Sequence, residues 1–315
     1  MSTASDAVSE RAPWRTALTP AELRSLLELR DIRSWGSLAI NWGLVAASFT
    51  LVAIWPNPLS IVLAIFVIGA RQLGFAVLMH EAAHRTLFRN PVWNDRFGNW
   101  LSAYPVWGDL HPYRPYHLQH HGRTWTDHDP DLGLVQPFPI TRASLRRKVW
   151  RDLSGQTGWK RAKFTLKRDL GWSQGRVRRR DGAGMRRLLG VIATNGILFG
   201  ILAAFGHPAL YLLWIAAWLT SYSLAMRIRS IAEHSMVSDP ASDLHNTRTT
   251  RARWWERLLI APNRVNFHLE HHLWMTVPHY NLPRLHRILS ERGVLDDALV
   301  TTGYRGVLEL ASSRT

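Results

Sequence analysis

The sequence contains no cysteine among its 315 residues. A chain without cysteine forms no disulfide, no cysteine-ligated zinc site and no iron–sulfur cluster on its own side chains. If its chemistry consumes electrons, a separate protein must therefore deliver them. Acidic residues are also scarce, because 23 Asp and Glu stand against 39 Lys and Arg, which gives a formal charge of +16. Such an excess indicates contact with nucleic acid or with an anionic membrane surface.

Charged residues are nearly absent from four apolar segments, at about residues 34–55, 59–79, 188–205 and 209–226. Each has roughly the 17–25 residues that a helix needs to cross a bilayer. The segments form two pairs, joined by Pro56-Asn57-Pro58 and by Gly206-His207-Pro208. Such short turns favour membrane hairpins over the core helices of a soluble protein. Arg71 lies inside the second segment, where a charge is costly and is usually paired or functional.

Positive charge is distributed unevenly around these segments. The two short turns contain no Lys or Arg, whereas residues 85–187 contain about twenty. The positive-inside rule therefore places both termini and the long middle loop in the cytoplasm. The first 15 residues have no basic run before an apolar stretch, so we expect no cleavable signal peptide. The basic loop fits anionic lipid headgroups without nucleic acid, and a docking patch for an acidic electron-transfer protein is the alternative.

Histidine is concentrated in three clusters, all on the cytoplasmic side in this topology. They read His80-Glu81-Ala82-Ala83-His84, His117-Leu118-Gln119-His120-His121 and His268-Leu269-Glu270-His271-His272. Residues three and four apart share one face of a helix, so each cluster can direct two or three imidazoles at one point. Imidazole binds iron or zinc near neutral pH. Eight such nitrogens exceed the needs of one tetrahedral zinc, and we expect two metal ions.

The first cluster also allows a different interpretation. It matches the HExxH signature of zinc proteases, in which two histidines bind zinc and the glutamate is the base. An intramembrane zinc protease would need one zinc, one further ligand and one water, which leaves two clusters without a role. A membrane protein that binds iron without catalysis is a further alternative.

A short helix is predicted before the first apolar segment. Thr19 is a suitable N-cap, Pro20 suits the first helical position, and Glu22 completes a capping box. The helix is amphipathic because of Leu23, Leu26 and Leu27 together with Arg24 and Arg30. This amphipathic helix lies either on the membrane surface or against the cytosolic cap.

Further motifs surround the second and third clusters. The second follows Tyr113-Arg114-Pro115-Tyr116 and precedes Thr126-Asp127-His128-Asp129-Pro130-Asp131, and the third follows Asn266-Phe267 and precedes Val277-Pro278-His279-Tyr280-Asn281-Leu282-Pro283. Together with the order of the clusters and the four segments, these motifs resemble the membrane fatty acid desaturase superfamily over roughly residues 20–292.

The resemblance implies an all-α integral membrane fold. Four transmembrane helices would form two hairpins, and a helical cytosolic cap would carry a di-iron site. Residues 1–33 would be an N-terminal cytosolic segment with the amphipathic helix, and residues 34–315 the membrane domain. Residues 80–187 and 227–315 would form its cap.

The resemblance also implies a ninth metal ligand, because the family uses a histidine shortly after the fourth span, a place that His234 fits. The expected ligands are His80, His84, His117, His120, His121, His234, His268, His271 and His272. Asn266 resembles the family's asparagine that reaches one metal through water. Carboxylates near the clusters are natural acceptors for imidazole N–H groups, namely Glu81, Asp129, Asp131 and Glu270. Glu233 is four residues from Arg229, and this pair would orient its neighbour His234.

The other histidines are not expected to bind metal. His207 lies on the far side of the membrane in the predicted topology. The rest are expected in loops or at the surface, namely His111, His128, His245, His279 and His286.

The resemblance implies an O2-dependent di-iron oxidoreductase that introduces a double bond into a long-chain fatty acyl group in the membrane. Two iron ions would be the cofactors and O2 the co-substrate. Electrons would come from a separate ferredoxin or cytochrome b5 type donor, since the chain has no His-Pro-Gly-Gly haem segment. An acyl or carotenoid hydroxylase or ketolase on the same scaffold is the alternative, because the histidine clusters do not separate these reactions.

Overall fold

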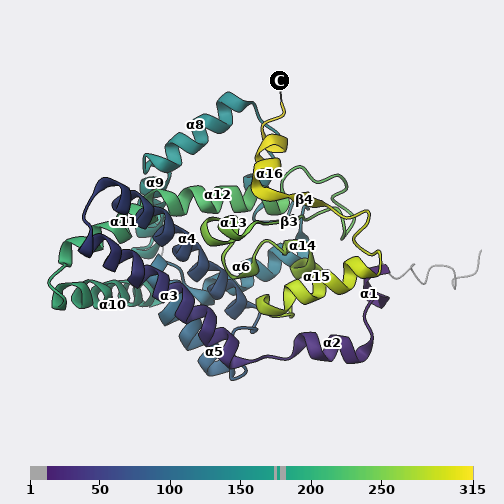
Figure 1. Cartoon of the computed structure of the whole chain (residues 1–315), viewed down its shortest axis with the longest axis horizontal. Coiled ribbons are helices and arrows are strands. Elements are labelled where there is room, and N and C mark those ends of the chain that lie inside the picture. The colour runs from purple at the N-terminus through teal and green to yellow at the C-terminus, as the bar shows by residue number, and fades with distance from the viewer. Residues whose placement is uncertain (1–12, 174–175, 178–181, 315) are drawn as a thin grey trace, which may run out of the picture.

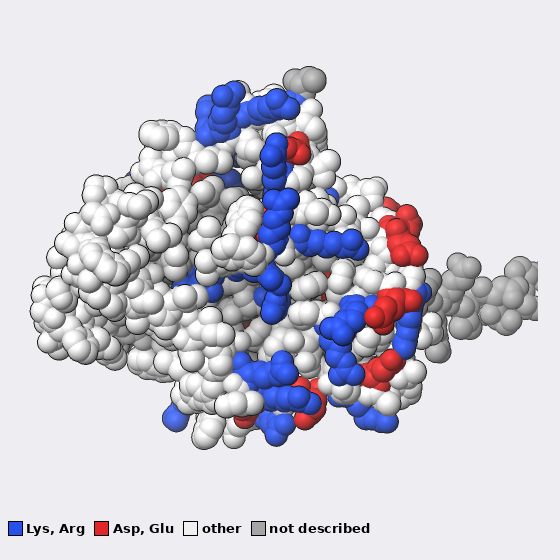
Figure 2. All heavy atoms as spheres, in the orientation of Figure 1, with Lys and Arg blue, Asp and Glu red and all other residues white. Residues whose placement is uncertain are grey.

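The computed structural model describes residues 13–173, 176–177 and 182–314, and most of them are helical (Figure 1). Four helices are long and apolar enough to cross a membrane, namely α3 (Asp31–Ile54), α4 (Pro58–Ala83), α10 (Gly182–Ala204) and the stretch Pro208–His234. The four predicted spans and the helical fold class are therefore confirmed. Figure 2 shows a surface almost free of charge where these helices lie, with Lys and Arg gathered beyond it.

Both hairpin turns are built by local backbone chemistry. Asn57 caps α4, because its side-chain oxygen accepts hydrogen bonds from the backbone N–H groups of Leu59 and Ser60, both at 3.1 Å. Gly206 has φ +82°, a conformation that glycine adopts without strain. Helices α3 and α4 pack side by side after the first turn (Figure 1).

The fourth span is interrupted, which the sequence pattern did not predict. It consists of η3 (Pro208–Leu210), α11 (Tyr211–Leu219) and α12 (Ser221–His234), with a break at Thr220 (φ −112°, ψ −88°). After the break, Ser221 Oγ donates a hydrogen bond of 2.6 Å to the Ile65 carbonyl of α4. A Cβ at Gly69 would overlap this hydroxyl, so glycine permits the close contact of the two helices. The contact fixes α12 beside α4 and so positions His234.

Arg71 is buried in α4, with 4% of its surface exposed. Its guanidinium donates to the Leu258 carbonyl and approaches the Asn41 side chain at 3.5 Å. Leu258 lies at the end of α13 (Trp254–Leu259), where free carbonyl groups favour a cation. The charge in the span is therefore stabilised by a hydrogen bond to a helix-terminal carbonyl, and no carboxylate among the described residues pairs with it.

The other elements are short. Those before the third span are α1 (Pro13–Thr16), α2 (Pro20–Leu27), α5 (Pro91–Gly98), the π-helix η1 (Asn99–Ala103), η2 (Tyr104–Val106), α6 (Leu110–Arg123), α7 (Leu132–Val135), α8 (Arg142–Leu153), α9 (Gln156–Asp169), β1 (Trp172–Ser173) and β2 (Arg176–Val177). Those after the fourth are β3 (Thr249–Arg251), η4 (Pro262–Arg264), α14 (His268–Leu273), η5 (His279–Asn281), α15 (Leu282–Glu291), β4 (Val300–Thr302) and α16 (Gly303–Ala311). Strands β1 and β2 pair antiparallel, and β3 and β4 pair parallel.

Helix α2 packs against the cap. Its predicted capping box is confirmed, since Thr19 accepts from the Glu22 backbone and the Glu22 carboxylate accepts from Thr19 N at 2.8 Å. Leu26 is fully buried in one cluster with Leu269 of α14 and Leu285 of α15. Of the two placements that the sequence left open, the structure therefore has the helix on the cap.

Candidate metal centre

Four elements bring the nine expected histidines together. His80 lies in the last turn of α4, and His84 is the C-cap of that helix. The second cluster lies on α6, the third on α14, and His234 is the last residue of α12. The centre is therefore assembled at the ends of two membrane spans and on two helices of the cap.

The nine imidazoles form two groups. The five-histidine group is His80, His84, His117, His121 and His271, and the four-histidine group is His120, His234, His268 and His272. Within each group, one nitrogen of every residue lies within 4.8 Å of all the others. Each cluster directs two imidazoles at one group, as expected, whereas His120 and His271, the middle histidines of the second and third clusters, each join the other group.

The spacing of the nitrogens fits metal ligation. In the five-histidine group, the Nε2–Nε2 distances are 2.8 Å for His80 and His271 and 2.9 Å for His84 and His117. In the other group, His234 Nε2 lies 2.7 Å from His268 Nε2 and 3.1 Å from His120 Nε2. Two nitrogens ~2.1 Å from one ion and about 90° apart are separated by about 3 Å. The geometry therefore suits one ion in each group.

Burial favours the neutral, ligating form of these imidazoles. Burial, with neighbouring imidazoles, holds the pKa of His117, His268, His271 and His272 well below the ordinary histidine value. Burial lowers the pKa of His84 to about 4. Neutral imidazole presents a lone pair to a metal. His272 Nε2 is buried without a hydrogen-bond partner among the described residues, and a metal ion would satisfy such a nitrogen.

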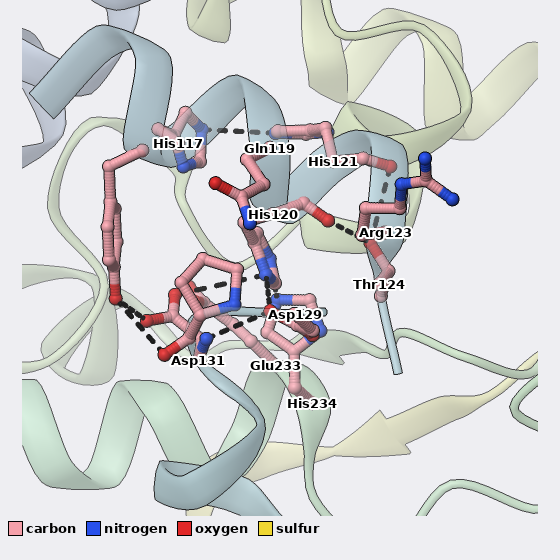
Figure 3. A network of polar contacts seen from close by, with 12 residues as sticks. His117, Gln119, His120, His121, Arg123, Thr124, Asp129, Asp131, Glu233 and His234 are labelled. Carbon is pink, nitrogen blue, oxygen red and sulfur yellow. Dashed lines mark hydrogen bonds and ion pairs between the residues drawn. The ribbon is translucent and has the colours of Figure 1, made fainter. Parts of the chain in front are cut away.

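A carboxylate orients His120 (Figure 3). Asp129 Oδ1 accepts from His120 Nδ1 at 2.8 Å, which leaves Nε2 of this ring directed at His234. Backbone N–H groups of Trp125 and Asp131 donate to the same carboxylate, both at 2.9 Å. Burial opposes ionisation, but the hydrogen bonds from His120 and from the backbone keep the pKa of Asp129 below its usual value. Asp131 is more remote, with Oδ2 3.9 Å from His120 Nδ1.

A second carboxylate lies behind His268. Glu233 is buried and pairs with Arg229 of the same helix at 2.6 Å, as their spacing predicts. Its other neighbour is His268 Nδ1, at 3.7 Å. The pair therefore lies on the side of α12 that faces His268 of the third cluster.

Glu81 and Glu270 contact histidines outside the two groups. Glu81 Oε2 accepts from the backbone N–H of His279 at 2.9 Å and lies 3.3 Å from His279 Nδ1. Glu270 Oε1 lies 2.5 Å from His286 Nδ1. His279 lies in the short connection between α14 and α15 and outside both groups, as expected, but it is 2% exposed and also contacts Ser37, so it is not at the surface. Glu81 and Glu270 stand inside metal-binding motifs, and buried carboxylates need hydrogen-bond partners. This requirement was the signal in the sequence that could have pointed to the two partner histidines.

Two more polar residues lie on the elements of the centre or beside them. Tyr113 Oη lies 3.3 Å from His80 Nδ1, and its ring stacks on His117 with centroids 5.2 Å apart. Tyr113 was not among the predicted site residues, although it precedes His117 by four residues on one helix and so shares its face. Asn266 donates to the Thr250 carbonyl at 3.0 Å, and its own Oδ1 is buried without a partner among the described residues.

Comparison with known proteins agrees with this geometry. Residues 54–304 match the fatty acid desaturase family. The chain is 28% identical to a dihydrorhizobitoxine desaturase of Bradyrhizobium elkanii, over 84% of this chain and 78% of that protein. It is 24% identical to an sn-1 oleoyl-lipid 12-desaturase of a Picosynechococcus strain, over 85% and 80%. It is 23% identical to a chloroplastic omega-6 fatty acid desaturase of Brassica napus, over 90% and 65%.

The family match covers most of the chain and includes all three histidine clusters and His234. The four membrane helices and the two groups of buried histidines agree with the architecture that the sequence motifs led us to expect. The chain is a multi-pass membrane oxidoreductase and belongs to the fatty acid desaturase family.

Proposed function

We propose that the protein is an O2-dependent di-iron enzyme that introduces a double bond into a long-chain fatty acyl group in the membrane. The observation that carries the proposal is the pair of histidine groups at the ends of two membrane spans. The relatives named above are desaturases of different substrates, one of them an oleoyl-lipid, so the acyl group is our inference.

The nine histidines would hold two iron ions, five on one and four on the other. Bound iron would activate O2 toward an unactivated C–H bond, which amino-acid side chains cannot do. The chain supplies the ligands, and Asp129 fixes the ring orientation of His120. Asn266 Oδ1 would hold a water beside one ion. Because the chain has no cysteine, a separate ferredoxin or cytochrome b5 type protein would supply electrons.

An apolar groove offers a place for the substrate chain. It has a volume of about 900 Å³ and runs between α3 and α10, from Trp42 and Leu101 to Phe205. Residues of η1 and η2 form one end of the groove. The chain continues from η2 into α6, which carries the second histidine cluster. We propose that part of the acyl chain lies in this groove, because apolar walls within the membrane suit a hydrocarbon.

The expected orientation places the metal centre in the cytoplasm. Because the chain lacks cysteine, a single introduced thiol reports one position. Ser154→Cys, in the turn between α8 and α9, should react with a membrane-impermeant maleimide only after cells are opened. Asn57→Cys, in the first hairpin turn, should react in intact cells. The opposite result would reverse the orientation.

Metal and product analysis test the proposal together. Expression in a host of defined lipids should yield new unsaturated acyl chains by mass spectrometry, and the purified chain should contain two irons. His271→Ala should abolish the product and reduce bound iron, whereas His245→Ala, outside both groups, should preserve them. A hydroxylated or keto product would support the alternative chemistry. A single zinc would refute the di-iron site.

A further inference from the structure

The hairpin of helices α8 and α9 carries a basic surface that the metal centre does not use. From Arg142 to Arg168 the sequence has ten Lys and Arg and one carboxylate, Asp152. That carboxylate is fully buried and accepts from Arg227 of α12 at 2.8 Å. The outer face of the hairpin therefore has no acidic residue to neutralise its charge.

Three arginines of α8 surround a shallow groove of about 420 Å³. The groove is lined by Arg146, Arg147, Trp150, Arg151 and Gln156. Positions 146, 147, 150 and 151 share one face of the helix. None of the three guanidinium groups pairs with a carboxylate within the described ranges. Figure 2 shows Lys and Arg gathered over the outer end of α8, at the top of the view. Guanidinium groups bind phosphate oxygens in bidentate fashion, so the groove suits a phosphate.

The hairpin is fixed against the start of α10 and the break between α11 and α12. A Cβ at Gly158 of α9 would overlap the backbone of Leu219, the last residue of α11. Arg161 donates to the Trp218 carbonyl at 2.5 Å, and Asp169 pairs with Arg187 of α10 at 2.8 Å. Helix α9 thus lies against the start of the third span, the level at which lipid headgroups are found, and against the break in the fourth span.

Aromatic side chains on the same hairpin also indicate that it lies at the level of the lipid headgroups. Trp150, Trp159 and Phe164 are 68%, 60% and 68% exposed. Large exposed aromatic residues beside Lys and Arg are typical of helices that lie in the membrane interface. A docking surface for a soluble protein would not need three such side chains beside membrane spans.

We propose that Arg146, Arg147 and Arg151 bind the phosphate of an anionic phospholipid, with Trp150 inserted beside its acyl chains. This site is independent of the proposed reaction, and it stands whichever product the enzyme forms. Three cations near an anionic surface contribute about 1 kcal/mol each, which corresponds to about 100-fold in affinity.

The purified full-length protein in detergent can be titrated with phosphatidylglycerol or phosphatidylcholine and bound lipid counted by native mass spectrometry. Wild type should retain phosphatidylglycerol preferentially, with an affinity that falls as salt rises. The triple variant Arg146→Gln, Arg147→Gln, Arg151→Gln should bind it about 100-fold more weakly. A matched variant, Arg24→Gln, Arg284→Gln, Arg287→Gln, removes three exposed cations of α2 and α15 and should bind as wild type.

Equal retention of both lipids by wild type would overturn the proposal without any variant. Unchanged phosphatidylglycerol affinity in the first triple variant would also overturn it. If that variant instead slowed only reduction by an acidic electron carrier, the groove would be a protein docking site and the lipid assignment would be wrong.

Discussion

Replacement of Asp129 by Asn tests whether the hydrogen bond behind His120 maintains a metal site (Figure 3). The carboxylate accepts from His120 Nδ1 at 2.8 Å and from two backbone N–H groups. An amide has one acceptor oxygen and adds two N–H donors. It therefore cannot satisfy all three donors, and it removes the negative charge that makes the imidazole a stronger ligand.

The size of the effect follows from the burial of this contact. The side chains of His120 and Asp129 are 3% and 2% exposed, so water does not replace the lost acceptor. A hydrogen bond to a charged group contributes about 1.5–3 kcal/mol. Loss of a carboxylate behind a metal-binding histidine costs about 10–100-fold in metal affinity, or about 1.4–2.8 kcal/mol. The two figures agree, and we expect Asp129→Asn to weaken metal retention in the four-histidine group within this range.

The assay measures iron per chain after dialysis against increasing concentrations of a chelator, alongside product formation. Asp131→Asn is the matched control, since Asp131 lies 3.9 Å from His120 and its side chain is 28% exposed. It should retain iron nearly as well as wild type. Equal iron loss in both variants, or wild-type retention in Asp129→Asn, would refute the reasoning. Thermal unfolding of the metal-free proteins shows whether a loss reflects the site or the fold.

Two further predictions concern the membrane helices. Gly74→Ala should destabilise the protein by about 1–3 kcal/mol, because the new Cβ would overlap the Asn41 side chain. The measurement is the melting temperature in detergent. The control Gly43→Ala should not lower it, because no atom lies within 4 Å of the added Cβ. Ala46→Trp should fill the groove between α3 and α10 and reduce product from long acyl chains on the order of 10-fold or more. The control Ala47→Trp, at an exposed position outside the groove, should leave the product yield unchanged. An equal loss of product in both variants would show that the substrate does not occupy the groove.

Much of the fold could be predicted because membrane spans and their turns are local features. Apolar length and short turns sufficed for four spans, and Thr19 and Glu22 sufficed for a capping box. The break at Thr220 could not be predicted, because it depends on contact between Ser221 and α4. The carbonyl that accepts a hydrogen bond from Arg71 lies 187 residues away in the sequence, so this contact could not be predicted either.

The candidate site was predicted in composition and only partly in arrangement. Spacing and resemblance identified the nine histidines that the structure brings together. Their division could not be read from each motif alone, since it depends on which helices face one another. The buried role of His279 was missed for the same reason, because its partners Glu81 and Ser37 come from two other helices.

Helix geometry explains why each HxxHH motif serves both groups. Successive residues turn by about 100°, so the first and last histidines of the motif lie about 40° apart. The middle histidine lies about 100° from the last one and cannot share its target. On α6 the pair His117 and His121 joins the five-histidine group, whereas on α14 the pair His268 and His272 joins the four-histidine group. Each helix thus gives its pair to one group and its third imidazole to the other. Two facing helices with this motif therefore specify two neighbouring metal sites, where two HxxxH motifs would specify one.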